Sequence, residues 1–352
     1  MYNKLILSIS SIAVVSISQA FSQDTVKVKT DMPDQTAELN YNSGVEQLGL
    51  KNYDKAVEFF SKSIESKPNF EKAFYNRGIA KYEKKDFQGA LEDINKTIEI
   101  NALHPESYFE RGQIKYALKD LPAASADYLK ASELKPDYAE AHYYRGGILF
   151  EQNQYKEAID EFNKAIIIKP DYAYALNDRG SAHKMLNELD AAISDYNKAV
   201  IADNKLHFAF NNLGTAKRNK GDMKGAIEAY NRAIELKPDY SIALNNRGDA
   251  KYEDKDYEGA IKDFSLALKY QPNYFYALNN RASAKIKLKN YNEALDDCTS
   301  AIKINTQYGA AYLNRGIAKE MLRDFKGACD DWNKALELGV NAASSYTNRD
   351  CK

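Results

Sequence analysis

Small and apolar residues recur along this chain with a period of 34 residues. A glycine or alanine occupies the same position of nine successive segments: Gly44, Gly78, Gly112, Gly146, Gly180, Gly214, Gly248, Ala282 and Gly316. An alanine follows twelve residues later in every segment: Ala56, Ala90, Ala124, Ala158, Ala192, Ala226, Ala260, Ala294 and Ala328. Most segments then carry a large aromatic residue: Phe60, Tyr128, Phe162, Tyr196, Tyr230, Phe264 and Trp332. This pattern predicts two closely packed helices per segment.

The small residues let the two helix backbones approach, and the aromatic residue fills the space between them. Proline closes most segments, and it ends a helix because it lacks an N–H and disfavours helix in the residue before it. The closing prolines are Pro68, Pro136, Pro170, Pro238 and Pro272. An Asp or Asn follows each of them and is expected to cap the next helix.

The period divides the chain into nine repeats without insertions, spanning 37–342. Their predicted bounds are 37–70, 71–104, 105–138, 139–172, 173–206, 207–240, 241–274, 275–308 and 309–342. In the last segment, Tyr346, Asn348 and Arg349 fall in the register of Tyr312, Asn314 and Arg315. We therefore expect 343–352 to form a partial C-terminal capping helix that covers the apolar end of the array.

The first residues follow a different pattern. A short basic start, MYNK, precedes the uncharged run LILSISSIAVVSIS and the small-residue stretch SQAFSQ. This order predicts a secretory signal peptide over 1–22, with cleavage after Ser22 favoured over Ala20, and a linker over 23–36. The alternative is an uncleaved membrane anchor. Because no second apolar span follows, we expect an exported chain in the periplasm or outside the cell, without a membrane span once the signal is removed.

The repeated pattern resembles the tetratricopeptide repeat (TPR) family, and the residues that carry the resemblance are those given above. The resemblance implies an all-α fold, a right-handed superhelical solenoid of nine 34-residue helix-turn-helix repeats. In that architecture the first helices line a concave face and the second helices a convex one. Thr97, Cys298, Thr306 and Val340 depart from the family pattern at single positions only.

Charged residues appear and disappear together within the repeats. Seven repeats carry an Arg before the small residue and an acid sixteen residues later, whereas the two repeats without the Arg also lack the acid. We predict structural ion pairs within each hairpin, partly buried. They are Arg77–Asp93, Arg111–Asp127, Arg145–Glu161, Arg179–Asp195, Arg247–Asp263, Arg281–Asp297 and Arg315–Asp331.

Paired asparagines interrupt the first helices of the later repeats, although Asn is a poor helix former. In the family these positions point into the groove, and a carboxamide matches the N–H and C=O of an extended backbone. We therefore predict an asparagine ladder that binds an extended peptide in the concave groove. Its residues are Asn177, Asp178, Ser181, Lys184, Asn211, Asn212, Thr215, Arg218, Asn245, Asn246, Asp249, Tyr252, Asn279, Asn280 and Ser283.

The earlier repeats place aromatic residues at the first of these positions: Tyr41, Tyr75, Phe109 and Tyr143. Two interpretations remain open for this aromatic half of the groove. The rings bind apolar side chains or stack on sugars, or they pack against one another and stiffen the array.

Composition narrows the function further. With 49 basic and 50 acidic residues the chain has no basic stripe, so nucleic acid is not an expected partner. The four histidines, His104, His142, His183 and His207, lie in separate repeats without ligand spacing, so we expect no metal, cofactor or catalytic site. Cys329 and Cys351 are predicted to bond in an oxidising compartment, the alternative being two thiols that never meet.

These features predict an exported scaffold that mediates protein–protein interaction by binding an extended polypeptide. Two alternatives are a structural or assembly component of the cell envelope and a glycan or cell-wall binder that uses the Tyr-rich N-terminal half. An enzyme is not expected, because no residues are placed to carry a reaction.

Overall fold

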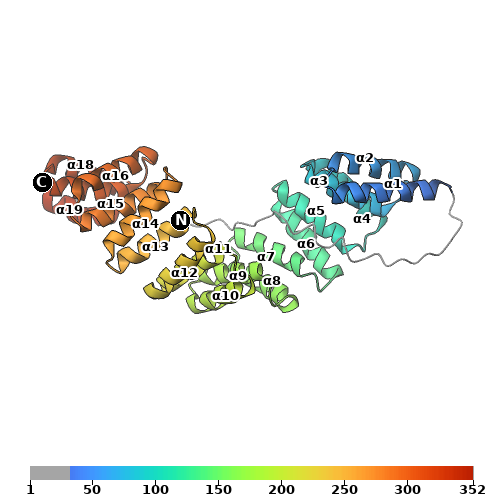
Figure 1. The fold of residues 1–352 in the computed structure, drawn as a ribbon, viewed down its shortest axis with the longest axis horizontal. Coiled ribbons are helices and arrows are strands. Elements are labelled where there is room, and N and C mark those ends of the chain that lie inside the picture. Colours follow the sequence, from blue (N-terminus) through green and yellow to red (C-terminus); the bar gives the residue numbers. More distant parts are fainter. Residues whose placement is uncertain (1–31, 352) are drawn as a thin grey trace. The chain divides into compact units, whose positions relative to one another are not determined.

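The computed structural model describes residues 32–351, and these residues form helices joined by short turns (Figure 1). The predicted signal peptide and the linker up to residue 31 lie outside the described residues. Each repeat contributes a first and a second helix. The first helices are α1 (Met32–Gly49), α3 (Glu71–Glu83), α5 (Pro105–Ala117), α7 (Ala139–Glu151), α9 (Ala173–Met185), α11 (His207–Asn219), α13 (Ser241–Glu253), α15 (Phe275–Lys287) and α17 (Gly309–Met321). The second helices are α2 (Tyr53–Ser66), α4 (Phe87–Ile100), α6 (Leu121–Leu134), α8 (Tyr155–Ile168), α10 (Leu189–Ala202), α12 (Met223–Leu236), α14 (Tyr257–Tyr270), α16 (Tyr291–Ile304) and α18 (Phe325–Glu337).

The two ends of the array extend these pairs. At the N-terminal end, α1 begins at Met32, inside the segment assigned to the linker. At the C-terminal end, a 3-10 turn (Asn341–Ala343) leads into α19 (Ser344–Asp350), which lies in the segment assigned to the capping helix.

The helical pairs group into two compact units, and the division between them along the chain falls within α9. Of the described residues, 32–182 form the N-terminal unit and 183–351 the C-terminal unit. Each unit is considered by itself below.

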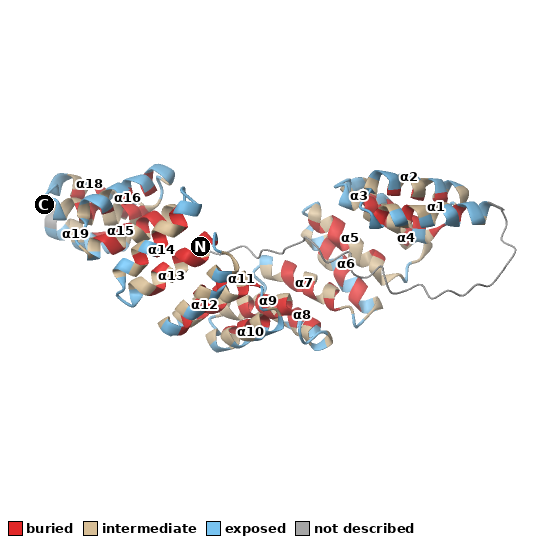
Figure 2. Cartoon of the chain, in the orientation of Figure 1, coloured by how far each residue is buried: buried red, intermediate tan, exposed pale blue. Residues whose placement is uncertain are grey.

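Close helix contact within a repeat depends on the small residue of the first helix. A Cβ atom added at Gly112 would lie 2.7 Å from the ring of Tyr128, and one added at Gly248 would lie 2.6 Å from the ring of Phe264. Any larger residue would therefore push the two helices apart. Buried positions alternate with exposed ones along the helices (Figure 2), and within a unit neighbouring repeats share core clusters.

The turns between helices differ from the expected capping scheme. After Pro68, Pro136, Pro238 and Pro272 the N-cap is an aromatic residue, such as Tyr138 or Tyr240, rather than the preceding Asp or Asn, so the cap prediction was wrong for these helices. Side-chain caps occur instead on second helices, where the carboxylates of Asp86, Asp222 and others accept a backbone N–H. One residue of each intra-repeat turn has positive φ: Lys51, Lys85, Lys119, Asn153, Asn187, Gly221, Lys255, Lys289 and Arg323.

Candidate functional site: the rungs between first helices

Within each unit, several first helices are linked to the next first helix by one pair of side chains whose members are 35 residues apart. We call such a pair a rung; its earlier residue is the inner member and its later residue the outer member. In the C-terminal unit the outer Nδ2 donates to the inner Oδ1 at 2.9, 3.2 and 2.9 Å. These rungs are Asn211–Asn246, Asn245–Asn280 and Asn279–Asn314. They connect α11, α13, α15 and α17, which contact one another in succession.

The inner asparagines are buried inside the array. Asn211, Asn245 and Asn279 are only 1%, 5% and 6% exposed, and Asn177 of the N-terminal unit is 4% exposed. Because the carbonyl oxygens of Asn211, Asn245 and Asn279 already accept a bond from the next repeat, they are not available to a foreign strand. The prediction that both carboxamides of a pair face a ligand is therefore corrected. It fails because the first asparagine faces the neighbouring helix rather than the solvent.

The outer asparagines keep part of their hydrogen-bonding capacity. Asn246, Asn280 and Asn314 are half-buried, and among residues 32–351 no hydrogen bond reaches their Oδ1 atoms. Asn280 uses both amide protons, one toward Asn245 and one toward Oδ1 of Asp249 at 2.8 Å. Asn246 and Asn314 each retain one N–H together with the carbonyl. Asn212 is likewise half-buried.

The serine and threonine residues one helical turn after the inner asparagines donate hydrogen bonds to a backbone carbonyl or to a tyrosine hydroxyl. Ser181 and Thr215 donate to the carbonyl oxygens of Asn177 and Asn211 at 3.1 and 3.0 Å. Ser283 donates to the hydroxyl of Tyr252 at 3.1 Å. All four of Ser181, Thr215, Ser283 and Tyr252 are half-buried, so each also presents some surface.

Two acids near the rungs have unusual pKa values. Burial raises the pKa of Asp249 to about 6, although Arg218, 3.3 Å away, favours its charged form. Burial also raises the pKa of Asp178 to about 7, against the hydrogen bonds that it accepts from Asn177 at 2.9 Å and from Tyr143 at 3.0 Å. Burial lowers the pKa of the half-buried Lys184. Charge is therefore costly on this face of the molecule.

The aromatic half forms rungs of another kind in the N-terminal unit. The hydroxyl of Tyr41 accepts from Asn76 at 2.9 Å, and that of Tyr143 donates to Asp178. The rings of all four predicted residues pack on other rings: Tyr41 on Phe70, Tyr75 on His104, Phe109 on Tyr138 and Tyr143 on Tyr172, with centroids 5.0 to 5.2 Å apart. These contacts match the stiffening interpretation of the aromatic residues.

The arginines of the repeats form bidentate ion pairs with the acids sixteen residues later. The closest N–O distances are 2.6 to 2.7 Å in Arg77–Asp93, Arg111–Asp127, Arg145–Glu161, Arg247–Asp263, Arg281–Asp297 and Arg315–Asp331, with Arg145 making a single contact. Arg179 belongs to the N-terminal unit, where it donates to Asn163 at 2.6 Å, and Asp195 belongs to the C-terminal unit.

Sequence reasoning missed a second cation in these pairs. A lysine four residues after the arginine contacts the other carboxylate oxygen at 2.7 to 2.8 Å: Lys81, Lys115, Lys251, Lys285 and Lys319. The sequence contained a signal for this second cation, because in five repeats a lysine follows the arginine after four residues, one helical turn later. In repeat 4, His142 and Lys164 take its place, and against the effect of burial their hydrogen bonds and the charge of Arg145 lower the pKa of Glu161 to about 2.

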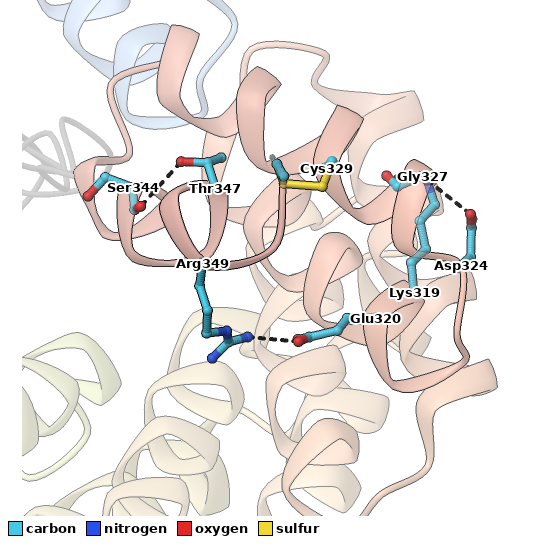
Figure 3. Close-up of a disulfide and its surroundings, with 9 residues drawn as sticks. Lys319, Glu320, Asp324, Gly327, Cys329, Ser344, Thr347 and Arg349 are labelled. Carbon is cyan, nitrogen blue, oxygen red and sulfur yellow. Dashed lines mark hydrogen bonds and ion pairs between the residues drawn. A yellow bond between two sulfur atoms is a disulfide. The ribbon is translucent and has the colours of Figure 1, made fainter.

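The C-terminal end is closed by a disulfide between Cys329 of α18 and Cys351 (Figure 3). Two further contacts hold α19: Arg349 pairs with Glu320 at 2.7 Å, and Tyr346 stacks on Trp332 with ring centroids 4.9 Å apart. Cys298 is a buried free thiol, and burial raises its pKa to about 12.

The four histidines lie apart from one another, each with its own contacts. His104 contacts Ser107 at 2.7 Å, His183 contacts Glu188 at 2.6 Å, and His207 packs edge-on against Tyr240. Across residues 32–351 no group of three or more His, Cys, Asp or Glu side chains is arranged to hold a metal ion. No helix in that range combines the length and apolarity that spanning a membrane requires.

Comparison with known families identifies the array. Tetratricopeptide repeat models match 37–70, 109–173, 241–274 and 275–308, and a further TPR repeat model matches 214–255. The chain belongs to the tetratricopeptide repeat family and is an all-helical TPR solenoid of nine repeats. Proteins of this family are typically non-catalytic scaffolds, and this chain is a TPR scaffold for protein–protein interaction.

Solved structures share the fold. The Cut9 and Hcn1 assembly of APC/C is 18% identical, with a TM-score of 0.58 over 90% of this chain and 76% of that one. A tetratricopeptide repeat protein from Parabacteroides merdae is 18% identical, with a TM-score of 0.56, and the match covers 70% of this chain and 99% of that one. YrrB, described as a TPR protein with an unusual peptide-binding site, is 26% identical, with a TM-score of 0.47. The match covers 53% of this chain and 97% of YrrB. No curated protein matches the chain.

Proposed function

We propose that this protein is an exported scaffold that captures an extended segment of another protein along the first helices of its C-terminal unit. The observation that carries the proposal is the row of outer asparagines. Asn246, Asn280 and Asn314 are held in place by their rungs, and their carbonyl oxygens face no partner among the described residues. Asn246 and Asn314 also keep one N–H each, which is the complement of a backbone N–H and C=O pair.

The spacing of this row suits a polypeptide in extended form. Packed helices lie about 8–10 Å apart. Three residues of extended chain span about 10 Å, so the side chains of every third residue would meet a new repeat. Three outer asparagines would thus hold a segment of roughly seven to ten residues through its backbone.

Side chains beside the row would add selectivity. Tyr252 and Ile286 are half-buried on α13 and α15, the helices of Asn246 and Asn280, and Arg218 is half-buried on the preceding first helix, α11. The ring of Tyr252 and the side chain of Ile286 offer apolar contact, whereas Arg218 is engaged with Asp249. We therefore infer a preference for apolar or aromatic side chains near the outer asparagines of repeats 7 and 8.

The proposed location outside the cytoplasm has two supports. The first 22 residues have the order of charges and apolar residues typical of a signal peptide. The Cys329–Cys351 disulfide is of a kind that persists in oxidising compartments such as the periplasm or the cell exterior. N-terminal sequencing of the protein recovered from the envelope or medium tests this: a start at Gln23 or Phe21 is expected, and an intact Met1 would contradict export.

The capture itself is tested with a displayed library of random twelve-residue peptides selected on the full chain. We expect the selected peptides to bind the triple variant Asn246→Ala, Asn280→Ala, Asn314→Ala at least tenfold more weakly in isothermal titration calorimetry. The matched control replaces Asn292 and Asn333, two exposed asparagines of second helices, with Ala. Equal binding by the triple variant and the wild type, with helicity unchanged, would rule out the row as the site.

A further inference from the structure

A carboxylate without a partner occupies the rung position of repeat 3. Glu110 of α5 stands where other repeats carry Asn76, Asn246 or Asn280, and the inner member of its pair is Tyr75. Within residues 32–351 no hydrogen bond or ion pair reaches the Glu110 carboxyl group, although the side chain is half-buried. Every other polar rung described above is closed by a hydrogen bond. An unpaired acid at a half-buried position costs free energy of folding.

Tyrosine side chains from several elements surround this acid. The charge of Glu110 raises the pKa of five hydroxyls, an effect second to burial at most of them: Tyr75, Tyr82, Tyr128, Tyr138 and Tyr144. These residues come from α3, α6, α7 and the turn before α7. The ring of Tyr144 stacks on Tyr128 with centroids 5.7 Å apart, and Phe109 meets Tyr144 at 5.6 Å. The acid is thus close enough to this group of aromatic rings for its charge to act on their hydroxyls.

A buried hydroxyl in the same cluster also lacks a partner. Tyr128 is fully buried, and its hydroxyl makes no hydrogen bond in the described part of the chain. The equivalent Tyr230 of the C-terminal unit donates to Thr215 at 3.2 Å. In repeat 3 the residue equivalent to Thr215 is Gln113, which bonds to Tyr144 instead. Both Glu110 and the Tyr128 hydroxyl therefore have an unmet capacity to accept a hydrogen bond.

The chain's own cations near this cluster are engaged elsewhere. Arg111 and Lys115 both contact Asp127 at 2.7 Å. Lys81 contacts Asp93 at 2.8 Å. Lys135 pairs with Glu106 at 3.2 Å while its ammonium lies 4.8 Å from the ring centroid of Tyr138. That last contact shows that a ring of the cluster can accept a cation.

We propose that Glu110 and the tyrosines around it bind an organic ammonium group, in particular the lysine side chain of a partner polypeptide. The half-buried rings of Tyr82 and Tyr144 attract the cation through their quadrupoles, and the half-buried carboxylate of Glu110 supplies the opposite charge. This site lies in the N-terminal unit and goes beyond the peptide capture proposed above. It rests on that function only for the source of the ammonium group.

Binding is expected to depend on pH. Burial and the charge of Glu83 raise the pKa of Glu110 to about 7, and the groups that face it from α3, α6 and α7 are otherwise phenols. A cation binds the ionised acid, so binding releases a proton below pH 7. The affinity should therefore fall by up to about tenfold between pH 7 and pH 6, and change little between pH 8 and pH 9.

The test uses the full chain and two probes, butylammonium chloride and an acetylated, amidated pentapeptide with one central lysine. A norleucine pentapeptide is the probe control. Calorimetry should show binding of the lysine peptide and at least a tenfold loss in Glu110→Gln. Glu92→Gln removes the same charge from an exposed position of α4 and should leave binding unchanged. Tyr82→Phe keeps an aromatic ring and should retain the affinity for the lysine peptide, whereas Tyr82→Leu removes the ring and should lower that affinity.

The outcomes of these experiments distinguish the possible sources of the bound ammonium group. Binding of both probes assigns the site to lysine side chains, and binding of butylammonium alone assigns it to a small amine. Binding of neither probe, or equal binding by Glu110→Gln and wild type, overturns the proposal. The three asparagine replacements in the C-terminal unit should not change butylammonium binding, so failure of peptide capture there is distinguishable from failure here.

Discussion

Within each unit, neighbouring first helices contact each other through the same sequence positions, but the residue types at these positions differ between the two units. In the C-terminal unit three successive rungs pair Asn with Asn, as in Asn245–Asn280. In the N-terminal unit the same spacing pairs Tyr41 with Asn76 and Tyr143 with Asp178, and leaves Glu110 unpaired. The backbone arrangement therefore determines which positions contact each other, whereas the residue types determine the charge and hydrogen bonding of each contact.

The difference has a physical consequence for each unit. An Asn–Asn rung is neutral and can be repeated along any number of repeats, since each amide is both donor and acceptor. A rung position that contains an acid, such as Asp178 or Glu110, can bring charge into a half-buried layer and make folding depend on pH, whereas a phenol stays neutral. The C-terminal unit thus has a uniform polar row, and the N-terminal unit has individual sites.

The ion triads are common to both units and provide the largest expected effect. Asp127 pairs with Arg111 and Lys115, and Asp263 pairs with Arg247 and Lys251. Replacing either acid by Ala leaves two cations partly buried and should lower the free energy of unfolding by about 3–5 kcal/mol. Urea unfolding with hydrogen exchange measures the loss in each unit. A much smaller loss in one unit would contradict a shared structural role; the exposed Asp254→Ala is the control.

The acid rung of Asp178 should distinguish the N-terminal unit by its pH dependence. Its pKa is raised from 3.8 in the unfolded chain to about 7, so folding loses stability as pH rises through this range. Asp178→Asn should match the wild type near pH 4 and gain stability of the order of 2–4 kcal/mol above pH 7. Thermal unfolding from pH 4 to pH 8 tests this. A parallel pH profile for variant and wild type would show that Asp178 titrates normally.

Much of the fold could be predicted from the sequence because its determinants lie within one repeat. The fit of Gly112 against Tyr128 depends on two residues sixteen positions apart in a single hairpin, and the Arg111–Asp127 pair has the same spacing. The helical bounds of such a hairpin follow from proline and small residues. Lys115 was missed although its recurrence one turn after Arg111 was visible in the sequence.

The rungs could not be predicted because they depend on how one hairpin rotates against the next. A change of rotation by one residue would expose Asn245 and bury Asn246, with the same sequence pattern. The family resemblance placed both asparagines in a groove, and only the side-chain contacts distinguished the buried from the half-buried member. The 35-residue spacing also recurs in Tyr41–Asn76 and Tyr143–Asp178, but it does not by itself tell which member of a pair is buried.

An inner asparagine of the C-terminal unit should have an intermediate effect. Asn211→Ala removes the acceptor of the Asn246 amide at a site that is 1% exposed, which should cost about 1–3 kcal/mol of unfolding free energy. Urea unfolding measures the cost, and Asn292→Ala on the exposed surface of α16 is the matched control. A loss no larger than that of the control would mean that the rung does not stabilise the array.

The phenol rung of the N-terminal unit should have the smallest effect. Tyr41→Phe keeps the ring contacts with Phe60 and Phe70 and removes only the hydroxyl that accepts from Asn76 at 2.9 Å. Because both members are half-buried, solvent can replace the lost bond, and we expect a loss of about 0.5–1.5 kcal/mol. Urea unfolding of this variant beside Asn211→Ala compares the two rung types directly. A loss in Tyr41→Phe equal to or above that in Asn211→Ala would show that burial does not set the strength of a rung.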